Sequence, residues 1–355
     1  MYLTKLVLNN FRSYPSSIFQ FTPNINLIIG NNGVGKTNIL EAIYFLASGK
    51  SFRSAPLSNL INWNSPQSAT VEGYSLKGNE NYLFEIQLIK KSSLCKTTIS
   101  RNYLINRVKK SRKKYLSQFN SVIFEPDDIR LVTGSPSRRR SFLDQVFSIN
   151  WHYCSALSQF NRALKHRNEL LDQIRNGQSQ PAELYYWNQS LAKNDVIVHN
   201  HRNLFIKFVN HFFSSHSSSE INKLFLTYYP SYLTPQIMEK NFQQEVSRGH
   251  TLAGCHRDDY TFSNRSFCTS NKELELWGSR GQQRLAVLAL RLAQIDFIES
   301  EFKDKPILLL DDIFSELDTT HRRLVGQICH TYQTILTSSE DEPLKYFEQA
   351  HQIRL

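Results

Sequence analysis

Apolar positions near the start of the chain alternate with polar ones or form short runs, which is the pattern of strands. Residues 1–11 alternate in the manner of a half-buried strand. The apolar run "NINLIIG" (residues 24–30) stops at a glycine and predicts a buried strand. After the next glycines, Ile39, Ile43 and Leu46 recur at helical spacing. The pattern therefore predicts a strand, a glycine loop and a helix in succession.

The middle of the chain changes from strand patterns to helical ones. Between about residues 69 and 107 short alternating segments are separated by turn residues, which predicts hairpins. From residue 137 to about residue 213 the apolar spacing is mostly helical, and "NGQSQP" (residues 176–181) interrupts it. We expect this region to be built mainly of helices.

The last third returns to mixed helix and strand signals. A periodic helix follows Gly281, and the apolar runs "PILLLDD" (residues 306–312) and "QTILTSS" (residues 333–339) predict two buried strands. Both chain ends therefore carry α/β signals around a helical middle. We expect an α/β protein with one lobe formed by residues 1–115 and 270–355, and an inserted, largely helical second lobe formed by residues 116–269.

Composition narrows the class of protein. The chain has 355 residues, which favours two lobes over a single core, and its formal net charge of +11 favours an anionic partner such as nucleic acid. No apolar run approaches the roughly 18 residues of a membrane span, and no secretory signal pattern opens the sequence. The five cysteines are scattered and form no CxxC pair, which favours reduced thiols. We expect a cytoplasmic protein that does not act at a membrane.

The first chemical motif is the glycine loop after the second strand. "GNNGVGKT" (residues 30–37) satisfies G-x-x-x-x-G-K-[ST] between a predicted strand and a predicted helix. In such a loop the backbone amides bind phosphates, the lysine reaches the β and γ phosphates, and the hydroxyl contacts magnesium. The sequence therefore predicts a site for ATP and Mg²⁺. Its expected cofactor-binding residues are Gly30, Asn31, Asn32, Gly33, Val34, Gly35, Lys36, Thr37 and Asn38, with Lys36 also assisting catalysis and Thr37 also binding the metal.

A second motif supplies the acidic partner of that loop. "ILLLDD" (residues 307–312) is an apolar strand that ends in two carboxylates, so we expect them at the sheet edge beside the loop. Asp311 is the predicted magnesium ligand. Asp312 is the predicted catalytic residue, placed to orient or deprotonate the attacking water. The alternative is that Asp312 caps a loop or pairs with an arginine.

A third motif opens the helix near the end of the chain. "SRGQQR" (residues 279–284) resembles the signature motif of ATP-binding-cassette ATPases, and "SELD" (residues 315–318) resembles the adjoining D-loop. The resemblance implies that Ser279, Gly281 and Gln282 cap the γ phosphate held by a second copy of the protein. It therefore implies a homodimer that forms in the presence of ATP. The alternative is a glycine-led helix start without a ligand.

Four longer blocks point to one family within that superfamily. The chain encodes no membrane domain and no long coiled coil, which disfavours transporters and chromosome-maintenance heads. It resembles the RecF family of recombination-repair ATPases, whose blocks are matched by "GKTNILEAIYFLASGKSFR" (residues 35–53), "PDDIRLVTGSPSRRRSFLD" (residues 126–144), "GCHRDD" (residues 254–259) and "LLDDIFSELDTTHRRL" (residues 309–324). Three features depart from the pattern. Cys255 replaces a usual proline, Asp312 replaces the glutamate of most cassette ATPases, and "LTSSED" lacks the switch histidine expected after the last strand.

The resemblance implies an SMC-head-like, P-loop ATPase that acts as an ATP-dependent clamp on double-stranded DNA. The family acts at junctions of single- and double-stranded DNA with RecO and RecR, promotes RecA loading, and hydrolyses ATP slowly, with stimulation by DNA. Two other functions stay open from the residues themselves. One is a soluble cassette ATPase that acts on a protein or ribosomal partner, and the other is a nucleotide-binding scaffold with little turnover.

Basic residues mark the expected DNA contacts. "RVKKSRKK" is such a strip, and a strip of this kind neutralises phosphates without reading sequence. Its basic residues are Arg107, Lys109, Lys110, Arg112, Lys113 and Lys114. Arg12 is a further candidate for the nucleotide site, because related repair ATPases use a matching arginine near the phosphates; the alternative is a surface salt bridge. Arg138, Arg139 and Arg140 could face DNA, a partner head or acidic side chains.

Overall fold

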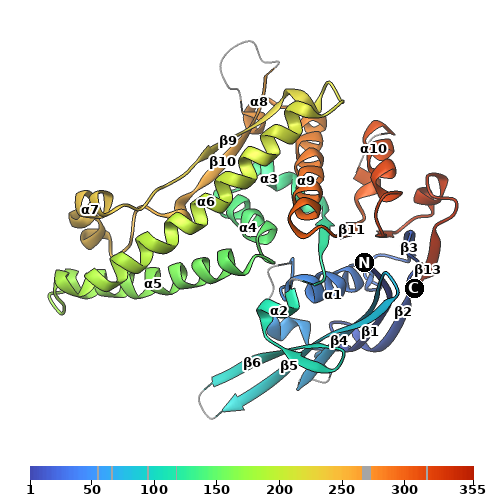
Figure 1. Cartoon of the computed structure of the whole chain (residues 1–355), viewed down its shortest axis with the longest axis horizontal. Helices are drawn as coiled ribbons and strands as arrows, with labels where there is room; N and C mark the ends of the chain where they lie inside the picture. Colours follow the sequence, from blue (N-terminus) through green and yellow to red (C-terminus); the bar gives the residue numbers. More distant parts are fainter. Residues whose placement is uncertain (54–55, 65–66, 94–95, 117, 266–272, 317–318) are drawn as a thin grey trace. The chain divides into compact units, whose positions relative to one another are not determined.

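The computed structural model describes the whole chain except residues 54–55, 65–66, 94–95, 117, 266–272 and 317–318. Its contacts divide it into a first unit, Met1–Asp128 with Gln294–Leu355, and a second unit, Ile129–Ala293. Figure 1 shows the first (blue) and last (red) segments of the chain within the same unit. The borders therefore lie 13 and 24 residues further along the chain than the predicted borders, 115 to 128 and 269 to 293.

Two elements account for the difference between the predicted and the observed borders. Strand β8 (Ser121–Phe124) pairs in parallel with β11 (Ile307–Asp311), so it belongs to a sheet of the first unit. Helix α9 (Arg280–Phe302) begins in the second unit and ends in the first. A short strand and the midpoint of a continuous helix carry no turn residues that mark a border in the sequence.

The first unit contains an antiparallel sheet of six strands in the order β2-β1-β4-β5-β6-β7. Buried and partly exposed residues alternate along its strands, as in β4, where Ala69 and Val71 are buried. The predicted hairpin is β4 paired with β5. The strands are β1 (Tyr2–Phe11), β2 (Tyr14–Gln20), β4 (Ser68–Lys77), β5 (Glu80–Ser93), β6 (Lys96–Ile105) and β7 (Val108–Lys110).

The second sheet of this unit has five strands in the order β13-β3-β12-β11-β8, and all its pairs are parallel. Every residue of β3 (Ile25–Ile29), β11 and β12 (Thr334–Ser338) is buried, as expected for central parallel strands. Strand β13 (His351–Arg354) closes the edge beside β3. The carboxyl ends of β3, β12 and β11 therefore meet at one edge of this sheet.

Helix α1 (Lys36–Ser48) lies in the core of the first unit and contacts strands of both sheets. Its predicted stripe residues Ile39, Ile43 and Leu46 are fully buried, and so are Leu40 and Phe45 on other sides of the helix. A helix that is apolar around most of its circumference is a buried helix. This packing holds the amino terminus of α1 at the end of β3. The chain continues after β11 through η6 (Ile313–Glu316) and α10 (Thr319–Cys329) into β12.

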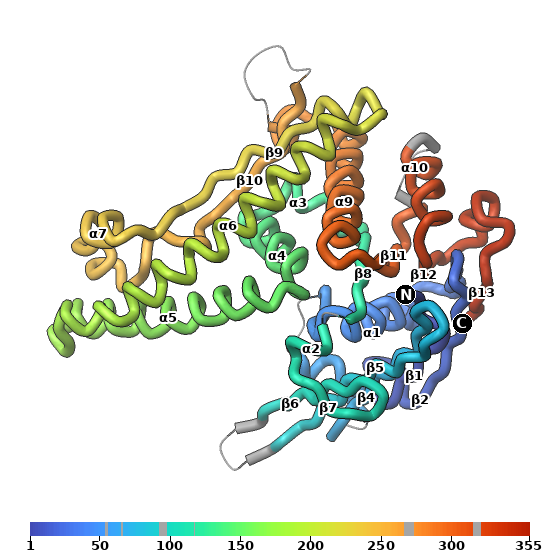
Figure 2. The backbone as a smooth tube through the Cα atoms, viewed as in Figure 1, coloured from blue at the N-terminus to red at the C-terminus, as the bar shows by residue number. Residues whose placement is uncertain are grey.

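The second unit is largely helical. Figure 2 shows its two longest helices, α5 (Trp151–Arg175) and α6 (Tyr185–Ser215), close together at the turn that joins them and diverging away from it. The predicted interruption at residues 176–181 is the turn between them. The other elements are α3 (Arg130–Thr133), α4 (Pro136–Val146), η3 (Pro181–Leu184), η4 (Ile221–Lys223), β9 (Leu224–Tyr229), α7 (Pro235–Arg248), η5 (Cys255–Arg257), β10 (Asp259–Asn264) and α8 (Leu274–Trp277). Among the described residues, no helix is both long enough and apolar enough to cross a membrane.

Candidate nucleotide-binding site

The glycine loop connects β3 directly to α1, as the motif requires. Gly33 and Gly35 have φ angles of +84° and +114°, a region of backbone conformation that favours glycine. A Cβ on Gly35 would lie 2.7 Å from the hydroxyl of Tyr14, so the loop is also closely packed against the side chain of Tyr14. Burial raises the pKa of Tyr14 to about 12, which keeps this hydroxyl neutral. The loop is therefore held at the start of α1 in a backbone conformation that requires glycine.

Lys36 lies across this loop. Its ammonium donates hydrogen bonds to the backbone oxygens of Gly30 and Asn31, at 2.6 and 3.0 Å. The residues of the loop from Asn31 to Gly35 are mostly exposed, so a ligand has access to their backbone. A phosphate oxygen that replaced the two carbonyls would meet a positive charge already in place.

The acidic motif and the loop meet, although they are far apart in the sequence. The hydroxyl of Thr37 donates to Oδ1 of Asp311 at 2.9 Å, and the hydroxyl of Thr337 donates to the same oxygen at 2.9 Å. Asp311 is the last residue of β11, and Thr337 lies opposite it on β12. Hydroxyl and carboxylate oxygens are the ligands that Mg²⁺ prefers, so Thr37 and Asp311 fit the metal expected here.

Asp312 follows the end of β11 in an unusual conformation. Its φ angle is +50°, which aspartate adopts more readily than most residues. Its backbone amide donates to Oγ1 of Thr337 at 3.0 Å. The predicted catalytic residue therefore has a backbone that is restrained by a hydrogen bond to β12. Of the expected D-loop, Leu317 and Asp318 lie outside the described residues.

Arg12 stands near the loop but is bound to a buried carboxylate. Its Nε and Nη2 donate to the two carboxylate oxygens of Glu41 at 2.9 and 2.6 Å, and Glu41 is fully buried in α1. The hydroxyl of Ser51 also donates to Glu41. Arg53 lies 3.9 Å from Glu41 and donates to the side-chain oxygen of Asn38. Glu41 was missed in the sequence, because it lies two residues from both Ile39 and Ile43, on the side of the helix opposite their stripe, where a carboxylate is expected to be exposed.

The signature turn forms the first turn of α9, in the second unit. The amide of Ser279 donates to Oε1 of Gln282 at 2.9 Å, and the amide of Gln282 donates to Oγ of Ser279 at 3.3 Å. This reciprocal pair is a capping box. A Cβ on Gly281 would meet only Oγ of Ser279, at 3.9 Å, so the space beside this glycine is open. The turn and the glycine loop lie in different units.

The basic strip is less uniform than its sequence. Arg107 donates to Glu72 and Glu85 at 3.3 and 3.0 Å, so its charge is already compensated. Lys109 lies exposed on β7, at the edge of the antiparallel sheet, and Lys113 is exposed on α2 (Arg112–Leu116). Within the strip, Arg107 is therefore paired with carboxylates of the same unit, whereas Lys109 and Lys113 are exposed.

Two arginines of the triple run bind the second unit itself. Arg139 donates from Nε and Nη2 to the carboxylate of Asp259 at 2.6 and 2.8 Å. Arg140 donates to the backbone oxygen of Asp258 at 2.9 Å. The sequence left three alternatives for Arg139, namely DNA, a partner head or acidic side chains. In the structure it contacts an acidic side chain. The "GCHRDD" block therefore takes part in the internal structure of the second unit.

Cys255 begins η5 in that block, and its amide has a specific partner. It donates to Oδ1 of Asp195 at 2.7 Å, and its backbone oxygen accepts from Arg202 at 2.6 Å. A proline at this position has no amide hydrogen to donate. The departure from the family pattern therefore adds a hydrogen bond to a buried carboxylate.

Together, the parallel sheet, the glycine loop with its lysine and the paired Thr37 and Asp311 define a P-loop protein of the ABC type with an SMC-like head. The Smc head domain of Pyrococcus furiosus, bound to the C-terminal domain of ScpA, is similar in fold, with a TM-score of 0.50 over 97% of this chain and 91% of that one, at 18% identity.

Sequence and structure comparisons identify the family. The profile of the RecF/RecN/SMC N terminal domain matches residues 2–355. The DNA replication and repair protein RecF of Geobacillus sp. (strain WCH70) is 34% identical over 98% of this chain and 94% of its own. That of Halalkalibacterium halodurans is 35% identical over 96% and 93%. The structures of the recombination mediator protein RecF of the RecFOR pathway with ATPrS and with ATP have TM-scores of 0.82 and 0.81, each at 28% identity over 96% of this chain and 92% of that one. The chain belongs to the RecF family of DNA replication and repair proteins.

Proposed function

We propose that this chain is an ATPase that binds ATP and Mg²⁺ at residues 30–38 and hydrolyses ATP slowly, faster when DNA is bound. The observation that carries the proposal is the contact between Thr37 and Asp311, which joins the two halves of the site across the parallel sheet. RecF structures described with ATP and ATPrS support the choice of nucleotide. The site belongs to a protein that we expect in the cytoplasm.

Each side chain has a defined task in this proposal. Lys36 exchanges its bonds to the carbonyls of Gly30 and Asn31 for bonds to phosphate oxygens. Thr37 and Asp311 hold the metal, which when bound neutralises charge that develops on the phosphates. Asp312 orients the attacking water or accepts its proton.

We further propose that ATP drives two copies together on double-stranded DNA. In this dimer, Ser279, Gly281 and Gln282 of one copy contact the γ phosphate of the other. The open space beside Gly281 supports a close approach of a ligand to this turn. Exposed lysines of the strip, such as Lys109 and Lys113, contact DNA phosphates. At junctions of single- and double-stranded DNA the clamp works with RecO and RecR to promote RecA loading.

Sedimentation velocity tests the clamp. The wild type is measured alone, with ATP–Mg²⁺, and with ATP–Mg²⁺ and labelled duplex DNA, and Ser279→Arg is measured in the same way. The matched control is Ser135→Arg, because Ser135 is also exposed and also occupies the N-cap position of a helix of the second unit, α4. We expect ATP to convert the wild type and the control into a DNA-bound dimer, and Ser279→Arg to bind ATP but stay monomeric. A wild type that stays monomeric with saturating ATP and DNA would refute the clamp.

Turnover is tested with Asp312→Asn. This change keeps the shape of the side chain and removes its charge, so we expect ATP binding to persist and turnover to be lost. Stimulation by duplex DNA, and more strongly by gapped DNA, would separate a DNA-repair ATPase from one that acts on a protein partner. Equal hydrolysis with and without DNA would contradict the DNA-dependent part of the proposal.

A further inference from the structure

The end of strand β12 contacts both halves of the nucleotide site. β12 lies between β3, which leads into the glycine loop, and β11, which carries the acidic motif. The amide of Gly30 donates to the backbone oxygen of Ser338 at 3.3 Å. The amide of Asp312 donates to the hydroxyl of Thr337 at 3.0 Å. This is also the point in the chain that lacks the switch histidine expected of cassette ATPases.

The hydroxyl of Thr337 makes two hydrogen bonds with neighbouring acidic residues. It donates its single hydrogen to Oδ1 of Asp311 at 2.9 Å and accepts from the amide of Asp312 at 3.0 Å. The backbone oxygen of Leu310 is a more distant acceptor, at 3.5 Å. Thr337 is 2% exposed, so water does not readily replace these partners if the hydroxyl is removed.

Both bonds act on groups whose geometry matters. Oδ1 of Asp311 also accepts from Thr37, so Thr337 and Thr37 hold the carboxylate from two sides. The backbone of Asp312 has a φ angle of +50°, a conformation that a non-glycine residue keeps only when its surroundings hold it. The bond from its amide to Thr337 is such a restraint. One hydroxyl thus orients the side chain of one aspartate and the backbone of the next.

We propose that Thr337 is a positioning residue for ATP hydrolysis, an inference that rests on the ATPase function proposed above. It sets the carboxylate of Asp311 for the metal and the carboxylate of Asp312 for the attacking water. It acts through these two residues and does not itself contact the reacting atoms. The hydroxyl is what matters, because serine offers the same two hydrogen bonds and valine, which has nearly the same shape, offers neither.

Steady-state kinetics on the full-length chain, with ATP and Mg²⁺ and with duplex DNA, test this role. We expect Thr337→Val to lower kcat about 10- to 100-fold, as for loss of one hydrogen bond to a charged group, with KM changed less than about threefold. Thr337→Ser should stay within about threefold of the wild type. The matched control is Thr334→Val, on the same strand and fully buried, whose hydroxyl donates to backbone oxygens, those of Cys329 and Tyr332. Its kcat should be unchanged.

Two outcomes would overturn the role. A kcat of Thr337→Val within about twofold of the wild type would show that the hydroxyl is not needed. A Thr337→Ser variant as slow as Thr337→Val would assign the effect to packing. If Thr337→Val gives no cooperative melting transition, Thr337→Ala, which also lacks the hydroxyl and is smaller, is judged by the same criteria.

Amide hydrogen exchange supplies a readout without nucleotide. In the ligand-free protein, the amide of Asp312 should exchange faster in Thr337→Val than in the wild type, and Thr337→Ser should restore its protection. Unchanged exchange in Thr337→Val would contradict the proposed restraint even if turnover falls. A wild type that hydrolyses no ATP would refute the ATPase function instead, and the exchange experiment would still decide whether Thr337 holds Asp312.

Discussion

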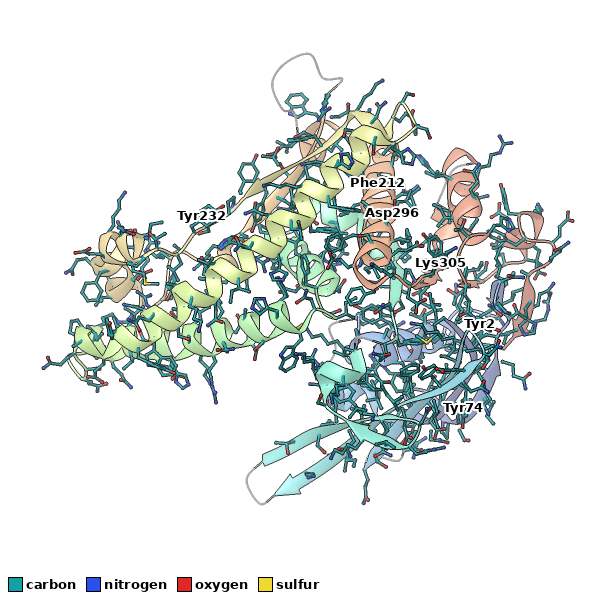
Figure 3. All side chains as sticks on the ribbon, in the orientation of Figure 1. Tyr2, Tyr74, Phe212, Tyr232, Asp296 and Lys305 are labelled. Atoms are coloured by element: carbon teal, nitrogen blue, oxygen red, sulfur yellow. The ribbon has the colours of Figure 1, made fainter. Side chains whose placement is uncertain are left out.

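His199 lies at the centre of a buried charged cluster in the second unit, and the cluster makes a quantitative prediction. On α6, its Nε2 lies 2.9 Å from Oδ1 of Asp258, and its Nδ1 lies 3.0 Å from Oδ2 of Asp195. Arg202 donates to the other oxygen of Asp258 at 2.7 Å. The ring of Tyr232, labelled in Figure 3, lies 4.7 Å from the imidazole, centroid to centroid. An imidazole that faces two carboxylates through both nitrogens is stabilised as the doubly protonated cation.

The pKa of His199 follows from two opposing effects. Burial alone would lower it, but the hydrogen bonds and charges of Asp195 and Asp258 outweigh burial and raise the pKa from 6.5 to about 9. Since the folded pKa exceeds the unfolded one, this group stabilises the fold fully below about pH 6.5. The stabilisation is lost as pH rises through about 9. Each pKa unit corresponds to about 1.4 kcal/mol, so the total is about 3 kcal/mol.

Urea unfolding between pH 6 and pH 9.5 measures this contribution in the wild type and in His199→Gln. Three of the four tryptophans, Trp151, Trp187 and Trp277, lie in the second unit, so their fluorescence reports mainly on its unfolding. We expect the wild type to exceed His199→Gln in stability by about 3 kcal/mol more at pH 6.5 than at pH 9.5.

The control is His201→Gln on the same helix, because Nδ1 of His201 lies 2.8 Å from the backbone oxygen of Ile197 in its own helix. Its stability should follow the wild-type dependence on pH. A difference between wild type and His199→Gln that stays constant with pH, or grows as pH rises, would refute the charged state of His199.

Three further predictions test the first unit. Gly35→Ala should lower the free energy of unfolding by more than the roughly 1–2 kcal/mol of a left-handed backbone, because its Cβ would also meet Tyr14 at 2.7 Å. Gly33→Ala should lose only the contribution of the left-handed backbone, because a Cβ there meets no atom within 4 Å. Thermal melting of both variants compares them. Lys36→Met should weaken ATP binding about 10- to 100-fold in a fluorescent-nucleotide titration, and unchanged affinity would argue against a phosphate contact. Lys109→Ala should reduce the slope of the logarithm of the binding constant for duplex DNA against the logarithm of salt concentration by about 0.9. An unchanged slope would show that this lysine does not contact DNA.

The glycine loop shows what short-range sequence can predict. Its glycines, Lys36 and Thr37 are contiguous in the chain, so their spacing alone specifies a strand, a loop and a helix start. The α/β class and the family resemblance were confirmed for the same reason, since each motif lies within one short segment. The buried, apolar strand β11 likewise ends at Asp311, as its sequence predicted.

Partner choice was decided by the tertiary structure. The predicted borders placed residues 121–124 in the second lobe, whereas the pairing of β8 with β11 places them in a sheet of the first unit. Arg139 pairs with Asp259, which is 120 residues away in the sequence, and Arg107 pairs with Glu72 and Glu85 on neighbouring strands. A basic residue in a sequence shows its charge but not its neighbour.

The candidate nucleotide site combines both kinds of information. The sequence by itself determined the residue types, Lys36, Thr37, Asp311 and Asp312, because local motifs carry them. Only the parallel pairing of β12 with β11 placed Thr337 opposite Asp311, where its hydroxyl reaches two acidic residues. The physical reason is that a motif needs only adjacent residues in one segment, whereas a hydrogen bond between segments depends on which strands the whole chain brings side by side.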